Sequence, residues 1–102
     1  MHIDLHTGDR EALRPLFELA EDSRAELDAY IGAGEVLVAV EGGEHVGHLQ
    51  LVGDEIKNMA VVETQRGRGV GRALVAAAIE RARDERIELR DRVWLDLRLD
   101  AG

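Results

Sequence analysis

The stretch Glu55 to Arg72, which reads EIKNMAVVETQRGRGVGR, contains the features that decide the fold. Its first part, EIKNMAVV, is rich in β-forming side chains and follows a Gly53-Asp54 turn signal, so it predicts a strand over residues 55–62. Its second part, QRGRGVGR, places three glycines and three arginines directly before a helical pattern. That pattern is the spacing of Leu74, Val75, Ala78, Ile79 and Ala82. The stretch therefore predicts a strand, a glycine-rich turn and a long helix.

Upstream of this stretch, the pattern predicts a short strand over residues 2–6 and then two helices. Thr7-Gly8-Asp9 supplies turn and N-cap residues, and Pro15 requires the first helix to start late or to bend. Ser23-Arg24-Ala25-Glu26 has capping-box spacing and predicts the start of the second helix. Two strands follow, over residues 36–40 and 45–52, and Gly42-Gly43 favours a tight hairpin between them.

Near the C-terminus, Val93, Leu95, Leu97 and Leu99 alternate with polar residues and Trp94, which predicts a final strand. A strand that follows a helix suggests a parallel crossover. The expected fold is therefore α/β: a mixed, mostly antiparallel sheet with helices on both faces, in the order β-α-α-β-β-β-α-β. No repeat or linker divides the chain, so residues 1–102 are expected to form a single domain.

The composition excludes several classes of protein. The 102 residues include 13 basic and 21 acidic ones, for a net charge of −8 and a pI near 4.9, which argues against a nucleic-acid partner. No apolar run is long enough to span a membrane, and the N-terminus lacks the features of a signal peptide. The chain has no cysteine, which suits a reducing compartment. We expect a cytoplasmic protein.

The turn over residues 65–72 has the chemistry of a phosphate site. Glycines let the backbone approach a ligand closely, and the amides at a helix N-terminus attract anionic oxygens. Arg66, Arg68 and Arg72 add positive charge, with no acid among them. The spacing fits neither a P-loop nor the GxGxxG dinucleotide fingerprint. The alternative is that the glycines only turn the chain and the arginines only solubilise it.

The sequence Arg66-Gly67-Arg68-Gly69-Val70-Gly71 resembles the (Q/R)xxGx(G/A) signature of the GNAT N-acetyltransferases, and EIKNMAVV resembles the strand before it. The order of elements is also similar to that family over nearly the whole chain. The resemblance implies that acetyl-CoA is the cosubstrate, with its pyrophosphate on the amides of Arg68 through Arg72 and its pantetheine arm along the strand. The residues implied in cofactor binding are Met59, Ala60, Val61, Arg66, Gly67, Arg68, Gly69, Val70, Gly71 and Arg72.

The resemblance also implies a reaction, the transfer of an acetyl group to a primary amine, and a base for it. Glu55 begins the strand where many family members carry a glutamate that deprotonates the amine; it could equally be an exposed carboxylate at a strand end. Asn58 could hydrogen-bond an amide of the ligand, although a polar residue on a half-exposed strand is more often structural. His48 is a weaker candidate base, and no pattern indicates a metal site. The acids between Glu18 and Asp28 form either a solvated helix face or a surface that attracts a cationic acceptor.

The C-terminus departs from the family pattern. GNAT chains usually continue past the fifth strand into a helix, often with a tyrosine that acts as an acid, and then a hairpin, whereas this sequence stops at Gly102. Tyr30, the only tyrosine, does not match that position. One alternative is therefore a truncated module that binds coenzyme A or serves in assembly without turnover. We also expect a homodimer in which the strand at residues 93–99 pairs with a second copy.

Overall fold

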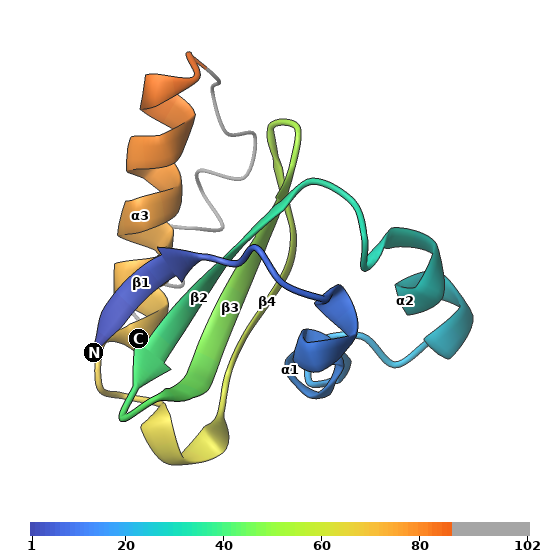
Figure 1. The fold of residues 1–102 in the computed structure, drawn as a ribbon, viewed down its shortest axis with the longest axis horizontal. Coiled ribbons are helices and arrows are strands. Elements are labelled where there is room, and N and C mark those ends of the chain that lie inside the picture. Colours follow the sequence, from blue (N-terminus) through green and yellow to red (C-terminus); the bar gives the residue numbers. More distant parts are fainter. Residues whose placement is uncertain (87–102) are drawn as a thin grey trace.

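The computed structural model describes residues 1–86, which form a sheet with helices on both of its faces (Figure 1). In chain order the elements are β1 (His2–Leu5), the 3-10 helix η1 (Arg10–Leu13), α1 (Arg14–Glu18), α2 (Arg24–Tyr30), β2 (Glu35–Glu41), β3 (Glu44–Val52), β4 (Glu55–Val61), the 3-10 helix η2 (Glu63–Gln65) and α3 (Val70–Asp84). The predicted strand over residues 93–99 and the dimer contact assigned to it lie outside the described residues.

The four described strands are arranged in the order β1-β2-β3-β4, and each pair of neighbours is antiparallel. Helix α3 covers one face of the sheet, while α1 and α2 cover the other (Figure 1). The α/β class, the antiparallel strands and the helices on both faces are confirmed. The parallel crossover would involve the final strand, which is not among the described residues.

The start of α1 shows how the chain accommodates Pro15. Residues Arg10–Leu13 form a 3-10 turn, and α1 begins only at Arg14, so the proline stands in the first helical turn, where its missing N–H costs nothing. The Asp9 side chain accepts a hydrogen bond from the Glu11 amide at 2.9 Å. Of the two expectations for this helix, the late start is the one observed.

Helix α2 begins where the capping-box pattern predicts, but with a different partner in one bond. Ser23 Oγ accepts from the Glu26 amide at 3.1 Å, as the pattern requires. The Ser23 amide, however, donates to the carboxylate of Glu21 at 3.0 Å, not to that of Glu26. The second hydrogen bond of the cap is therefore made by Glu21, in the loop before α2.

An irregularity in the pairing of β3 with β4 decides which side chains of β4 face which helices. In β3 and β4, Gln50 pairs with Asn58 and Leu51 pairs with Ile56, so Lys57 is an extra residue on β4. As a result Ile56 packs on the α3 side together with Met59, although strict alternation would put these two side chains on opposite faces.

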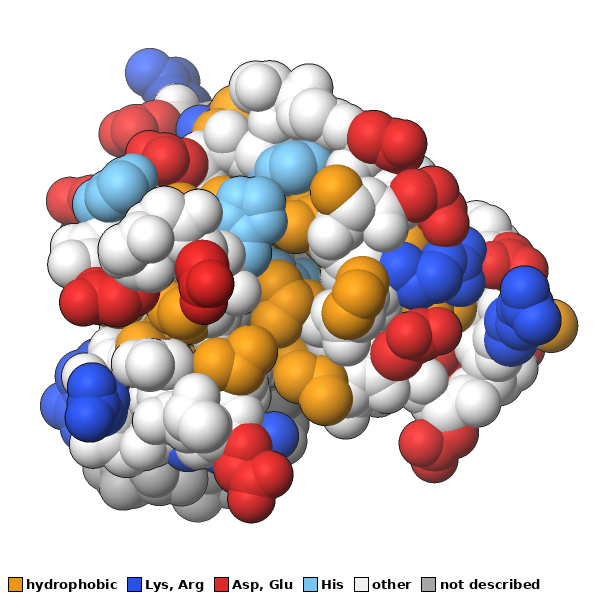
Figure 2. Space-filling view, turned by 60° about the horizontal axis from the view of Figure 1, so that its bottom comes forward, with side chains coloured by type: hydrophobic (Ala, Val, Ile, Leu, Met, Phe, Trp, Pro, Cys, Tyr) orange, Lys and Arg blue, Asp and Glu red, His pale blue; other side chains and the backbone are white. Residues whose placement is uncertain are grey.

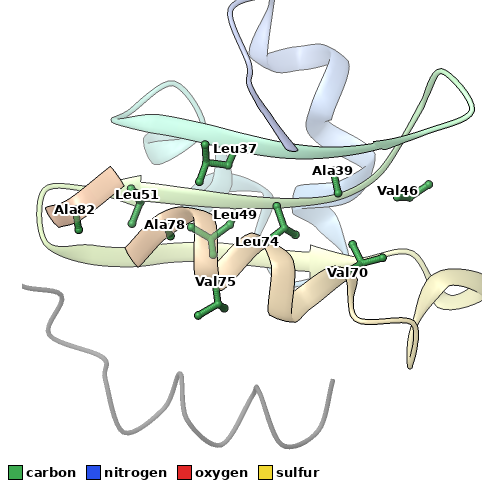
Figure 3. Packing of buried hydrophobic residues seen from close by; sticks show 10 residues of the cluster. All are labelled: Leu37, Ala39, Val46, Leu49, Leu51, Val70, Leu74, Val75, Ala78 and Ala82. Atoms are coloured by element: carbon green, nitrogen blue, oxygen red, sulfur yellow. The ribbon is translucent and has the colours of Figure 1, made fainter. Parts of the chain in front are cut away.

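The core on the α3 face is built from aliphatic side chains of β2, β3 and α3 (Figure 3). Its buried members are Leu37, Ala39, Val46, Leu49, Leu51, Val70, Leu74, Val75, Ala78 and Ala82. Gly47 allows α3 to approach closely, since a Cβ there would lie 3.1 Å from Val70 Cγ1 and 3.2 Å from Leu74 Cδ1. Fully burying one leucine stabilises a fold by about 1.5–3 kcal/mol, so this core anchors α3 to the sheet.

The opposite face holds a second core, in which Phe17 and Leu27 of α1 and α2 pack against the valines of β2. The loop after α2 is held by Arg10, which donates hydrogen bonds to the carbonyls of Ile31 and Ala33, both at 2.9 Å, and to that of Gly34 at 2.6 Å. Arg10 thereby ties the segment before α1 to the loop after α2. No helix within residues 1–86 has the length and apolar character needed to cross a membrane.

Candidate functional site

The turn over residues 65–72, called here the glycine–arginine turn, links η2 to α3. Gly67 and Gly69 have φ angles of 78° and 82°, in the left-handed region that glycine adopts without strain. A Cβ at either position would meet no atom of the described chain within 4 Å. The backbone angle, and not crowding, is therefore what requires glycine at these two positions, and the space beside them is open.

The first turn of α3 presents backbone amides at the glycine–arginine turn. Gly69 is the N-cap, and no side chain of the described residues caps the helix there. The first bond within the helix runs from the Ala73 amide to the Gly69 carbonyl at 2.9 Å, so the amides of Val70 and Gly71 precede it and have no acceptor inside the helix. Together with the helix dipole, they form a site suited to anionic oxygens.

Three arginines surround these amides. Arg66, Arg68 and Arg72 are all exposed, and Arg66 Nε donates to the carbonyl of Val61 at 3.1 Å. Their charge acts locally: the pKa of Glu41 is lowered, mainly by the N-terminal amine bonded to it and in smaller part by Arg68. The glycine–arginine turn is thus a positive region on an acidic chain, as the sequence predicted.

Strand β4 lies at the edge of the described sheet, next to the glycine–arginine turn. The Val62 amide donates to the Val46 carbonyl of β3 at 2.9 Å. Because backbone groups alternate in direction along a strand, those of Ala60 also face β3, whereas those of Met59 and Val61 face the outer edge. The bond from Arg66 to the Val61 carbonyl agrees with this direction.

The turn and the strand meet at Gly71. A Cβ on Gly71 would lie 3.5 Å from Met59 Cε and 3.9 Å from Val61 Cγ2, both ordinary contact distances. The start of α3 therefore sits over the part of β4 whose backbone faces outward. Most of the residues predicted to bind a cofactor are brought together here, with the main-chain groups of Ala60 directed to the neighbouring strand.

Glu55 lies at the other end of β4, where it pairs with Val52. The length of the strand separates it from Val61 by about 20 Å. Because the extra residue Lys57 shifts the alternation, Glu55 falls on the same face as Asn58, which is the face of α1 and α2. The structure thus places Glu55, the candidate base, on the α1 and α2 face of the sheet and away from the glycine–arginine turn.

A group of buried and half-buried polar side chains between the sheet and α2, called here the polar layer, was not predicted. It consists of His48, Gln50, Asn58 and Tyr30. Asn58 connects its members: its Oδ1 lies 2.7 Å from His48 Nε2, and its Nδ2 donates to the Tyr30 hydroxyl at 2.9 Å and to the Phe17 carbonyl at 3.3 Å. The Tyr30 hydroxyl in turn donates to Glu21 at 3.0 Å. The sequence pattern puts Asn58 on a half-exposed strand, whereas its side chain is only 5% exposed.

The imidazole of His48 is fully buried and stacks on Phe17, with ring centroids 4.3 Å apart. Burial lowers its pKa to about 4, so the ring is neutral at neutral pH. Since Asn58 accepts through Oδ1, His48 carries its proton on Nε2. Nδ1 then is a buried acceptor without a partner among the described residues.

Gln50 and Tyr30 complete the polar layer. Gln50 Nε2 donates to the carbonyls of Tyr30 and Ala33, at 2.8 and 3.0 Å, and so ties β3 to the end of α2. Burial raises the pKa of the Tyr30 hydroxyl, which remains protonated. The alternation of His48 and Gln50 in HLQL was a sequence signal for this layer. For Asn58 there was no such signal, because the face on which it lies depends on the bulge.

The acids between residues 18 and 28 are partly used within the chain. Asp28 binds Arg14 at 2.7 Å, and Glu21 accepts from Tyr30. Figure 2 shows acidic side chains spread over the side of the molecule formed by α1 and α2, and hydrophobic side chains exposed near the middle of the same face. Within residues 1–86, no group of three or more histidines and carboxylates is arranged to hold a metal ion.

Comparison with known proteins identifies the family. A sequence profile of the Acetyltransferase (GNAT) family matches residues 5–101. A GNAT family acetyltransferase from Elizabethkingia anophelis, solved with acetyl-CoA bound, is 30% identical, with a TM-score of 0.75 over 84% of this chain and 60% of that one. A Bacillus subtilis acetyltransferase, solved in complex with CoA, is 34% identical, with a TM-score of 0.71 over 80% of this chain and 57% of that one.

An IAA acetyltransferase from Bacillus cereus is 29% identical, with a TM-score of 0.73 over 84% of this chain and 61% of that one. The chain thus spans less than two thirds of the length of these three proteins. No curated protein gives a significant match. With a profile match over almost its whole length and these structural similarities, the chain belongs to the GNAT acetyltransferase family.

Proposed function

We propose that this protein transfers an acetyl group from acetyl-CoA to an amine. The observation that carries the proposal is the meeting of two features: the amides and arginines of the glycine–arginine turn, and the outer edge of β4 at Met59 and Val61. The relatives solved with acetyl-CoA or CoA bound support it, because they share the fold over 84% and 80% of this chain.

The residues present fit acetyl-CoA. Open space beside Gly67 and Gly69 suits a pyrophosphate, and the amides of Val70 and Gly71 supply donors for its oxygens. Exposed Arg68 and Arg72 add charge, and all the groups in this set are donors, which excludes a cationic ligand there. Acetyl-CoA would supply an activated acyl group.

The chain's own groups then have separate roles. Outward backbone groups of Met59 and Val61 would pair with the pantetheine amides, as an added strand does, and an outward amide would donate to the thioester carbonyl. Glu55, on the face of α1 and α2, would accept the proton of the amine directly or through water. The acids on that side favour a cationic amine.

Calorimetry with coenzyme A tests the binding site. Gly69→Val should abolish binding, because it forces a strained backbone angle and fills the open space. Gly53→Val is the matched control: Gly53 also has a positive φ, 62°, and open space, but it lies in the β3–β4 turn. Equal affinity in the wild type and Gly69→Val would rule out the site.

Thiol release with a panel of amines tests the activity. Turnover that Glu55→Gln lowers, with coenzyme A affinity retained, supports Glu55 as the base, and the loss should be greatest where the amine is mostly protonated. An unchanged pH–rate profile would remove Glu55 from the mechanism. Binding without release from any amine would favour the alternative predicted from the sequence, a binding module without turnover.

A further inference from the structure

Lys57 is the only lysine of the chain. It is the extra residue of the β4 bulge and is exposed. Its Nζ lies 5.0 Å from the centroid of the Tyr30 ring, on the face of α1 and α2. The bulge therefore turns a primary amine toward the side of the sheet on which Glu55 and Asn58 also lie.

The position of Lys57 along the strand brings this amine within reach of the thioester site. Met59, whose backbone faces the outer edge, is two residues away, or about 7 Å along an extended strand. A lysine side chain is of comparable length, with a flexible four-carbon stem. Rotation of the side chain away from Tyr30 would carry Nζ toward the Met59 edge.

We propose that the protein acetylates Lys57 within its own chain; this inference rests on the proposed use of acetyl-CoA. The reaction needs the neutral amine, so the ammonium first gives up a proton to solvent or to Glu55. Nζ then forms a bond with the thioester carbonyl carbon, the C–S bond breaks, and a second proton passes from Nζ to the departing thiolate. The products are Nζ-acetyl-Lys57 and free coenzyme A, and no oxidant or reductant is involved.

The ring of Tyr30 sets the resting state of this amine. A cation over an aromatic face is stabilised, which holds the Lys57 ammonium away from the strand edge. Acetylation removes that charge, and with it the attraction to the ring. The modification therefore leaves the α1 and α2 side of the molecule more acidic and the face of Tyr30 without its cation.

Mass spectrometry tests the proposal. The purified protein, incubated with acetyl-CoA, should gain the mass of one acetyl group, and peptide mapping should place it on Lys57 and not on the α-amine of Met1. The rate should saturate with acetyl-CoA and should not depend on protein concentration, because transfer is intramolecular. Lys57→Arg keeps the charge over Tyr30 and should lose the modification at this position completely.

Gly69→Val separates enzymatic from chemical acetylation. Because it removes the acetyl-CoA site, the rate at Lys57 should fall by at least about tenfold, whereas Gly53→Val should leave it unchanged. A rate that does not saturate, that Gly69→Val leaves unaltered, or that rises in proportion to protein concentration overturns self-acetylation. Self-acetylation is also overturned if the protein releases thiol with added amines while Lys57 stays unmodified. Loss of coenzyme A binding in the wild type would instead remove the proposed function itself.

Discussion

The glycine–arginine turn and the polar layer are two polar regions next to β4, and they differ in exposure and in charge. The turn is exposed and charged, and its two left-handed glycines have open space beside them. The layer is buried and uncharged at neutral pH, and Asn58 alone makes three hydrogen bonds inside the protein. The comparison teaches that polarity at the turn is directed outward, to a ligand, whereas polarity in the layer fixes α1 and α2 to the sheet.

The two regions also use glycine for different reasons. Gly69 in the turn and Gly34 beside the polar layer both have positive φ. A Cβ on Gly69 would meet nothing within 4 Å in the described chain, whereas one on Gly34 would lie within 1.9 Å of the Leu51 carbonyl oxygen. Gly69 is therefore needed for its backbone angle alone, whereas Gly34 is needed both for its backbone angle and for the lack of a side chain.

The largest expected effect distinguishes these two glycines. Gly34→Ala should destabilise the fold by more than about 4 kcal/mol, because strain and overlap with the backbone of β3 combine. Gly69→Ala should cost only about 1–2 kcal/mol, from the backbone angle alone. Urea unfolding measures both free energies of unfolding. Similar costs for the two variants would contradict the distinction.

Removing the centre of the polar layer should have the next largest effect. Asn58→Ala leaves the buried His48 Nε2–H without an acceptor and removes one of the two partners of the half-buried Tyr30 hydroxyl, so we expect a loss of roughly 2–4 kcal/mol in the free energy of unfolding. The matched control is the exposed neighbour: Lys57→Ala should cost no more than about 1 kcal/mol. If Asn58→Ala costs as little as the control, the layer does not stabilise the fold.

Acidification should weaken the polar layer through His48. Its pKa is about 4 in the folded protein and ordinary, near 6.5, in the unfolded chain. The unfolded chain therefore takes up this proton first, and stability falls as pH decreases from about 6.5 toward 4. Between pH 7 and pH 5 the loss is roughly 2 kcal/mol.

Urea unfolding of His48→Gln at both pH values isolates this contribution. Glutamine does not titrate, so the variant should lose much less stability than the wild type over the same interval. Staying above pH 5 keeps the ion-paired carboxylates, whose pKa values are lowered, out of the comparison. Equal pH dependence in the two proteins would mean that His48 is not held neutral by burial.

The smallest effect on stability is expected at the glycine–arginine turn. Arg68→Ala should change the free energy of unfolding by no more than about 0.5 kcal/mol, because the side chain is exposed. The affinity of this variant for coenzyme A should nevertheless fall by about tenfold, and that affinity should depend less on salt concentration than the affinity of the wild type does. Arg24→Ala, at an exposed arginine of α2, is the control and should leave affinity unchanged.

The sequence by itself determined the order of the elements and the position of the turn. Signals such as Gly42-Gly43, Ser23 and the glycines before α3 act through backbone angles and local hydrogen bonds, so they can be read without knowing the fold. The same holds for the helical stripe that begins at Leu74. These signals were sufficient to place the candidate cofactor residues between β4 and α3.

Only the tertiary structure decided which face each residue of β4 presents. The pairing of Leu51 with Ile56 leaves Lys57 as an extra residue, and this shift turns Asn58 into the polar layer and Lys57 toward Tyr30. Side chains alternate between the two faces of a strand, so a single extra residue moves every side chain before it to the opposite face. The sequence has no local signal that shows where the extra residue lies. The bulge is set by packing of both faces of the sheet, and that depends on residues far apart in the chain.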